Sequence, residues 1–236
     1  MNSPTLALGL LWYLAFLLSL TCHESAHALA ARLGGDPTAF LAGSMTLNPA
    51  PHIRREPFGT VVVPILSYIA SGWMIGWASA PYDPAWRRLH PRRAAWMALA
   101  GPAANVLLAA VAAIAIRSGV SLGAFTIPER VGFAHVAAVA PGASALAGSA
   151  ADLLSILFSL NVLLAAFNLL PVPPLDGNAA LGLLLPEGAA RRLADFSRNR
   201  TLALVGLLLA WKMFDAFFRP IFLLSINLLY PGAGYQ

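Results

Sequence analysis

Residues 6–31 read LALGLLWYLAFLLSLTCHESAHALAA, an apolar run with a small polar cluster near its end. About 20 consecutive apolar residues are enough for a helix to cross the hydrocarbon core of a bilayer. No Lys or Arg precedes the run, and it continues as far as Ala31, unlike a cleaved signal peptide. We therefore interpret residues 6–31 as a retained transmembrane helix.

The composition of the chain also indicates a membrane protein. Of its 236 residues, 58% are hydrophobic and 11% are charged, and the mean hydropathy is +0.71. Soluble domains carry about 25% charged residues, so a soluble domain, a disordered chain and a nucleic-acid-binding domain are excluded. The length predicts one integral-membrane domain over residues 1–236, with a core at 6–185 and a C-terminal hydrophobic segment at 202–230. The single cysteine, Cys22, excludes an internal disulfide.

Four further segments are apolar enough to be considered as spans, and they are Phe58–Ala80, Ala94–Ile116, Leu153–Leu170 and Leu202–Tyr230. The last segment contains Pro220, so it is either one kinked helix or a span followed by a helix on the membrane surface. The prediction is an all-α polytopic membrane protein, a bundle of about four to six transmembrane helices.

The arginines predict how these segments cross the membrane. They cluster after the first segment, before the third and after the fourth, whereas the connection 118–152 holds only Arg130. Short arginine-rich loops stay in the cytoplasm. If Phe58–Ala80 crossed the bilayer, the loops with Arg54 and Arg87 would face opposite sides. We therefore expect this segment to be a re-entrant or hairpin segment on the cytoplasmic side, with the N-terminus outside.

Chemistry is concentrated in His23-Glu24-Ser25-Ala26-His27, near the inner end of the first helix. Residues i and i+4 share one face of a helix, so both imidazoles can bind one ion. The H-E-x-x-H spacing is typical of zinc metalloproteases, in which the Glu is the general base. The alternative is a chance polar cluster. Ionisable residues within an apolar span are costly and usually functional, which favours a metal site.

A zinc site of this kind needs a third protein ligand. Asp176 is the strongest candidate, because it closes the run Asn168-Leu169-Leu170-Pro171-Val172-Pro173-Pro174-Leu175-Asp176-Gly177 at the same end of the bundle as His23 and His27. The prolines end the regular helix and could turn the carboxylate back toward it. The alternative is a solvated Asp at a helix end, and the residues alone leave this open. Cys22 points about 100° away from His23 around the helix.

Together the motifs HESAH (23–27), GPAAN (101–105) and NLLPVPPLDG (168–177) resemble the site-2 protease family of intramembrane zinc metallopeptidases, over about Leu6 to Leu185. The chain is similar to the compact bacterial branch, without PDZ or CBS modules. The resemblance implies that His23, His27 and Asp176 bind one Zn²⁺ ion per chain and that Glu24 activates the water. It implies that Asn168 supports the substrate or the oxyanion and that Asn105 faces the site. The alternative for either amide is an interhelical hydrogen bond.

The resulting hypothesis is a zinc endopeptidase that cuts peptide bonds in or near transmembrane segments of membrane proteins. The alternative is a non-hydrolytic membrane metal carrier or sensor with the same ligands. Two His and one Asp would also admit iron, manganese or cobalt. The expected partners are the lipid bilayer and a substrate with a transmembrane helix, and the sequence carries no signal for an oligomeric state.

We expect a multi-pass protein of the cell membrane with its active site in the cytoplasmic half of the bilayer. At 1.5 Å per residue, His27 and His23 lie about 8 and 14 Å inside the helix end near Arg32. A helical substrate must unwind before it is cut, because its carbonyls are bonded within the helix. An exposed strand edge within 40–60, with Phe40–Leu47 as a short strand, is one place where the extended peptide could bind.

Overall fold

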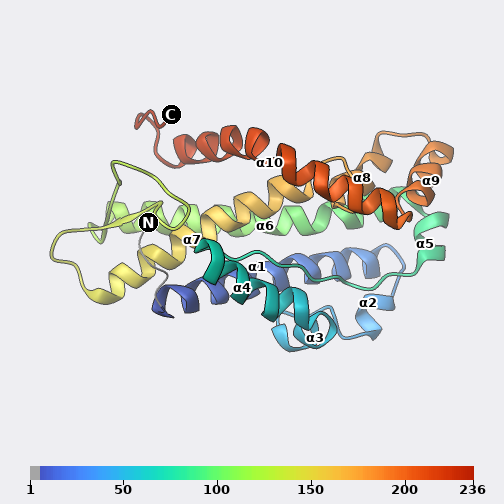
Figure 1. Cartoon of the computed structure of the whole chain (residues 1–236), viewed down its shortest axis with the longest axis horizontal. Helices are drawn as coiled ribbons and strands as arrows, with labels where there is room; N and C mark the ends of the chain where they lie inside the picture. The colour runs from blue at the N-terminus through green and yellow to red at the C-terminus, as the bar shows by residue number, and fades with distance from the viewer. Residues whose placement is uncertain (1–5) are drawn as a thin grey trace.

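The computed structural model describes residues 6–236, which form an elongated bundle of helices (Figure 1). In chain order the elements are α1 (Leu6–Leu33), α2 (Thr38–Leu41), α3 (Pro49–Arg55), the π-helix η1 (Phe58–Val62), α4 (Val63–Ser71), α5 (Pro84–Leu89), α6 (Pro91–Ser121), β1 (Phe125–Thr126), β2 (Ala138–Val139), α7 (Ala145–Asn168), α8 (Asp176–Ala180), the 3₁₀ turn η2 (Leu181–Leu183), α9 (Glu187–Phe196) and α10 (Arg200–Leu229).

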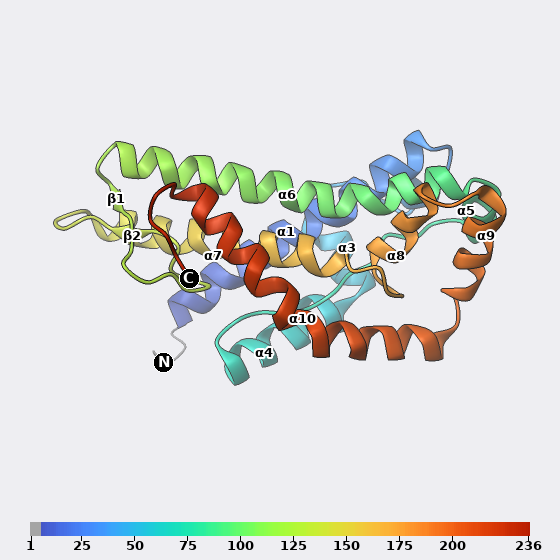
Figure 2. The same ribbon diagram turned by 90° about the horizontal axis from the view of Figure 1, so that it is seen from above.

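Four helices of the described chain are long and apolar enough to cross a membrane: α1, α6, α7 and residues Thr201–Leu229 of α10. The prediction of an all-α polytopic membrane protein is confirmed. Helix α6 packs against both α1 and α7, and α1 also contacts α7, so these three helices form the centre of the bundle (Figure 2). Their apolar core includes Trp12, Phe16, Ile116 and Ile156, each almost completely buried.

The last hydrophobic segment is one helix, α10, with Pro220 inside it. Figure 2 shows that the two halves of α10 run in different directions. Proline lacks the amide that would bond the preceding turn, and it is a common cause of such a bend. Of the two alternatives for residues 202–230, the kinked helix is the one found.

The segment Phe58–Ala80 folds into a short helical unit, η1 followed by α4, and then returns as chain without regular secondary structure. The Trp77 amide donates to the Gly59 carbonyl over 3.1 Å, so the two ends of the segment lie side by side. Gly59 and Gly76 permit this contact, because a Cβ at Gly76 would lie 2.1 Å from the Gly59 oxygen. The segment therefore doubles back on itself, and its re-entry into a membrane stays a prediction.

The expectation of a strand at Phe40–Leu47 is wrong. Residues Thr38–Leu41 form the helix α2, and turns follow as far as residue 48. The turn is fixed to α1 because the Ser25 hydroxyl donates to the Thr46 carbonyl. Within residues 6–236 the only strands are β1 and β2, which pair antiparallel between α6 and α7.

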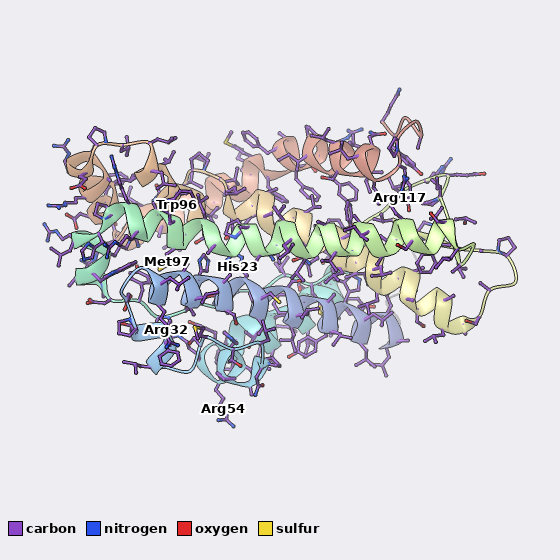
Figure 3. The ribbon with its side chains drawn as sticks, turned by 180° about the vertical axis from the view of Figure 1, so that it is seen from behind. His23, Arg32, Arg54, Trp96, Met97 and Arg117 are labelled. Carbon is purple, nitrogen blue, oxygen red and sulfur yellow. The ribbon has the colours of Figure 1, made fainter. Side chains whose placement is uncertain are left out.

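The two ends of the bundle differ in character. The C-terminal end of α1, the helices α5 and α9 and the start of α6 gather at one end, whereas β1 and β2 lie at the other, on the side of the C-terminus (Figure 2). Figure 3 shows Arg32 and Arg117 at opposite ends. We call the first of these the arginine-rich end, because it carries Arg32, Arg87, Arg88, Arg92, Arg93, Arg191 and Arg192.

Candidate metal centre

Three donor atoms from two helices converge inside the bundle. His23 and His27 lie one turn apart on α1, and Asp176 is the first residue of α8. Asp176 Oδ2 lies 3.2 Å from His23 Nε2 and 3.3 Å from His27 Nε2, and the two Nε2 atoms are 2.9 Å apart. Around a tetrahedral zinc ion with donors at about 2.0–2.1 Å, neighbouring donors are about 3.3 Å apart. The three residues fit such an ion.

The Nδ1 atom of each imidazole, which is not one of the three donor atoms, is hydrogen-bonded to an oxygen of an amide side chain or of the main chain. His23 Nδ1 lies 2.6 Å from Asn105 Oδ1, and His27 Nδ1 lies 2.8 Å from the Met97 carbonyl oxygen. His27 Nδ1 must therefore be the protonated donor, because a backbone carbonyl only accepts. His23 Nδ1 is likewise the donor as long as the Asn105 amide turns its Oδ1 toward it. A neutral imidazole in this tautomer presents the Nε2 lone pair, which is what a metal ion requires. Buried Asp176 Oδ2 makes no hydrogen bond to any atom of residues 6–236.

The motif GPAAN brings α6 close to the two imidazoles. A Cβ built on Gly101 would lie 2.4 Å from His27 Nε2 and 2.6 Å from His23 Nε2, so no larger residue fits here. Asn105, one turn further along α6, is fully buried and reaches His23. Figure 3 shows His23 and Met97 where α1 and α6 run side by side. The motif thus serves the packing and orientation of the two histidines.

The proline-rich run places Asp176. Helix α7 ends at Asn168, and the following turns are closed by bonds from Val172 N to Leu170 O and from Leu175 N to Val172 O. A Cβ at Gly177 would lie 2.2 Å from the Leu169 oxygen. Glycine therefore lets α8 begin directly against the end of α7, and this position turns Asp176 toward α1.

A cavity of about 240 Å³ lies beside the three donors. Its lining is formed by His23, Glu24, His27, Ala31, Ala39, Ala78, Ser79, Ala80, Pro81, Tyr82, Met97, Asn168, Pro174 and Asp176. Glu24 is 5% exposed and shares the cavity with the donor atoms. Five of the six predicted site residues therefore meet here, and Cys22 is not in the lining.

The two predicted asparagines are placed differently. Asn168 lines the cavity, and its Nδ2 donates to the Leu164 carbonyl over 3.0 Å. Asn105 lies behind His23, outside the cavity lining, where it forms an interhelical hydrogen bond. An interhelical hydrogen bond was the alternative role for Asn105. Its partner in this bond is His23, one of the three donor residues.

Sequence reasoning missed three parts of this site. Ser19 and Asn161 are fully buried and hydrogen-bonded toward Asn105, and residues 78–82 form one wall of the cavity. An amide in the middle of an apolar span was the signal available for Asn161. Nothing in the local pattern of 78–82 indicated a place beside His23.

Comparison with known proteins agrees with this site. The sequence model described as Peptidase family M50 matches residues 11–213. "Putative zinc metalloprotease YwhC" of Bacillus subtilis is 33% identical over 193 residues, which cover 80% of this chain and 76% of that protein. Rip2 of Mycobacterium tuberculosis, named in the same way, is 30% identical over 207 residues, which cover 88% of this chain and 70% of Rip2. No solved structure gives a significant match.

Proposed function

Because this chain belongs to Peptidase family M50, the site-2 protease family, we propose that it is a zinc metalloendopeptidase that cuts in or near the transmembrane segments of other membrane proteins. The observation that carries the proposal is the convergence of His23, His27 and Asp176 donor atoms within 4.8 Å beside a cavity that holds Glu24. The alternative of a metal carrier or sensor needs no such glutamate, and membership of a peptidase family does not favour it.

In this proposal His23, His27 and Asp176 hold the metal. Bound zinc would supply Lewis acidity, which lowers the pKa of a water to about 7 and polarises a carbonyl oxygen. The described residues contain one group of three His, Cys, Asp or Glu donors this close together. We therefore expect one zinc ion per chain.

Two further side chains in the cavity have roles in the proposed reaction. The Glu24 carboxylate takes a proton from the attacking water and later donates it to the leaving amine. The Asn168 amide nitrogen carries two protons, and one of them is bonded to Leu164 O. The other has no acceptor within residues 6–236 and can stabilise the negative charge that develops on the substrate oxygen. Asn105 acts on His23 rather than on the substrate.

The charge distribution supports a site in the cytoplasmic half of the membrane. The arginine-rich end would face the cytoplasm, because short loops rich in Arg are retained there. His23 lies about 14 Å from Arg32 along α1, at 1.5 Å per residue, and the whole hydrocarbon core is about 30 Å thick. The cavity would therefore open toward cytoplasmic water.

The burial of the metal donors supports an extended substrate. In a helix each backbone carbonyl accepts from the amide four residues on and is surrounded by side chains. The donor atoms lie beside a cavity inside the bundle, so a substrate carbonyl can reach them only after it leaves its helical hydrogen bond. The transmembrane helix of the substrate must therefore unwind where it is cut.

The experiment that tests the proposal compares Glu24→Gln with wild type. Glu24→Gln keeps the three metal donors and removes the proton acceptor, so it should retain zinc and lose cleavage. Membrane proteomics of cells that express each variant should reveal peptides ending inside predicted spans with wild type only. Glu129→Gln, at an exposed position in the loop before β2, is the matched control and should leave cleavage unchanged. If the same peptides appear with Glu24→Gln as with wild type, or appear with neither, this chain does not produce them through Glu24, and the metal carrier or sensor would be favoured.

A further inference from the structure

Behind His23 lies a chain of hydrogen bonds that joins three helices. Ser19 on α1, Asn105 on α6 and Asn161 on α7 are all 0% exposed. Asn161 Nδ2 donates to Ser19 Oγ and to the Leu157 carbonyl, both over 2.8 Å, and Asn105 Nδ2 donates to Asn161 Oδ1 over 2.8 Å. Asn105 Oδ1 then accepts from His23 Nδ1 over 2.6 Å. Ser19 and Asn161 reach the metal centre through Asn105.

In this chain of hydrogen bonds, which group donates and which accepts is fixed by backbone carbonyls at the Ser19 and Asn161 end. The single Ser19 hydroxyl proton goes to the Ala15 carbonyl over 2.7 Å, so Ser19 Oγ can only accept from Asn161. The amide group of Asn161 is therefore turned with Nδ2 toward Ser19 and Leu157 and with Oδ1 toward Asn105. Because Asn161 presents an oxygen, Asn105 must face it with the donor Nδ2, and its own Oδ1 is left to accept from His23.

This polarity decides which nitrogen of His23 carries the proton. An oxygen at His23 Nδ1 bonds only to a protonated Nδ1, so in the neutral ring the Nε2 lone pair points at His27 and Asp176. If Asn105 were flipped, its Nδ2 would face His23 and its Oδ1 would face Asn161 Oδ1. The flipped amide would favour a proton on Nε2, and metal binding would then have to displace that proton.

The two histidines differ in what holds them. His27 Nδ1 is bound by the Met97 main-chain carbonyl, which has only one polarity. His23 depends on the Asn105 amide, whose Nδ2 donates to Asn161 Oδ1 over 2.8 Å and, over a longer 3.5 Å, to the Ser19 carbonyl. The tautomer of His23 is therefore the part of the metal centre that single substitutions away from the cavity can disturb.

We propose that Asn161 and Ser19 are positioning residues that act through Asn105 to hold His23 in the metal-binding tautomer, and so set the zinc affinity of the centre. The proposal rests on His23, His27 and Asp176 being the zinc ligands. Partners in the outer hydrogen-bonding layer of metal sites typically change metal affinity by about 10–100-fold. In this proposal the buried side chains of Ser19, Asn105 and Asn161 orient a metal ligand as well as join helices α1, α6 and α7.

The test measures the zinc dissociation constant of purified, detergent-solubilised protein in chelator-buffered zinc. Asn161→Leu removes the nearer acceptor of Asn105 Nδ2, Asn161 Oδ1 at 2.8 Å, and leaves only the Ser19 carbonyl at 3.5 Å. We expect zinc affinity to fall roughly tenfold. Ser19→Ala keeps the bond from Asn161 to Leu157 and should give a smaller loss in the same direction. Ser155→Ala is the matched control, because Ser155 is also 0% exposed on α7, but within the described chain its hydroxyl oxygen accepts from the amides of Val136 and Ala137, far from Asn105 in the hydrogen-bond network. It should leave zinc affinity unchanged.

A double-mutant comparison separates positioning from general packing. If Asn161 acts through Asn105, then Asn105→Leu combined with Asn161→Leu should bind zinc no more weakly than Asn105→Leu alone. Additive losses, or an equal loss in Ser155→Ala, would show that packing alone is disturbed and would overturn the proposal. If Asn161→Leu does not fold, Ser19→Ala decides, and unchanged zinc affinity in it would also overturn the proposal. Wild type that binds no zinc would refute the ligand set instead.

Discussion

Asp176 is the only one of the three donor residues that comes from outside α1, so it closes the metal centre. We expect Asp176→Ala to weaken zinc binding by far more than Cys22→Ala, because it removes one of three ligands and leaves two imidazoles alone. Cys22 precedes His23 but does not line the cavity. Zinc content per chain after dialysis checks this. Unchanged zinc in Asp176→Ala would remove Asp176 from the ligand set.

Gly101 provides a second test at the level of single residues. In Gly101→Ala the new methyl group would overlap both Nε2 atoms, at 2.4 and 2.6 Å. The imidazoles would have to move, so we expect zinc affinity to fall by about tenfold or more. Gly148→Ala is the matched control, since it also lies in a long helix and has nothing within 4 Å of its Cβ position. It should keep zinc and gain roughly 0.5–1 kcal/mol of stability. Equal zinc affinity in both variants would contradict the prediction.

Short motifs predict some of these residues and miss others for a physical reason. His23 and His27 are related by helical periodicity, which is local, so sequence places them on one face. Ser19, Asn105 and Asn161 meet only because three helices pack together, and nothing local specifies that packing. Asn105 could be singled out through its motif, whereas Asn161 had only its apolar surroundings as a signal. Hydrogen-bond networks between helices that are far apart in the sequence are therefore not predictable from local sequence patterns.

Among the connecting elements, Asp36 links the end of α1 to the chain that precedes α5. Its carboxylate is 1% exposed and accepts from Thr38 N, Thr38 Oγ1 and Asp83 N. Burial alone would raise the pKa of the Asp36 carboxyl, but these hydrogen bonds lower it overall. Asp83 follows the cavity wall 78–82, so Asp36 also anchors one end of that wall.

The sign of this pKa shift predicts the pH dependence of stability. Because the pKa is lower in the folded than in the unfolded chain, Asp36 stabilises the fold fully above its unfolded pKa of about 3.9, and this contribution is lost as pH falls through the folded pKa. We expect Asp36→Asn to lose about 1–3 kcal/mol at pH 7. The difference in melting temperature from wild type should shrink below about pH 4.

The control for this prediction is Asp195→Asn. Asp195 forms an exposed ion pair with Arg88 at 3.5 Å, and exposed pairs contribute little. It should melt like wild type at neutral pH. A difference between Asp36→Asn and wild type that stays constant from pH 7 to about pH 3 would show that ionisation of Asp36 is not what stabilises this connection.

Hydropathy predicts the long elements and fails for the short ones. The helices α1, α6, α7 and α10 have apolar runs long enough to identify by length alone. Phe40–Leu47 has the length of a strand, but the two strands of residues 6–236, β1 and β2, pair with each other. Its first residues belong to α2, and the turn that follows is held by Ser25. An isolated strand has no stability without a neighbouring strand.

At the level of the whole molecule, the doubling back of residues 59–77 predicts a membrane topology. Single cysteines introduced at Arg54, Arg87 and Arg198, in a Cys22→Ala background, should react with an impermeant maleimide from the same side of the membrane. Ala143, which lies beyond β2 at the other end of the bundle, should react from the opposite side. Comparison of intact with permeabilised cells is the measurement. Labelling of the positions 54 and 87 from opposite sides would show that Phe58–Ala80 crosses.

The whole molecule must also open a substrate helix. Unwinding in hydrocarbon leaves backbone groups unpaired, at several kcal/mol each unless they find new partners. The wall 78–82 has no regular secondary structure, and its amides at Ala78, Ser79, Ala80 and Tyr82 make no hydrogen bond within the described chain. Glycine or proline near the cut lowers helix stability by about 1 or 3 kcal/mol per residue, which reduces the cost of opening.

We therefore expect that replacing glycine or proline near the cut by Leu in a true substrate slows cleavage about tenfold or more, since 1.4 kcal/mol corresponds to a factor of about ten. The Leu-substituted helix should still be captured by Glu24→Gln, because binding of the intact helix precedes its unwinding. Cleavage rates and capture are measured on the same pair of substrates, with Leu substitutions two turns away from the cut as the control. If several substrates are cut at the same rate with and without their helix-breaking residues, local unwinding does not limit the reaction. If capture falls in step with cleavage, those residues serve recognition of the helix rather than its opening.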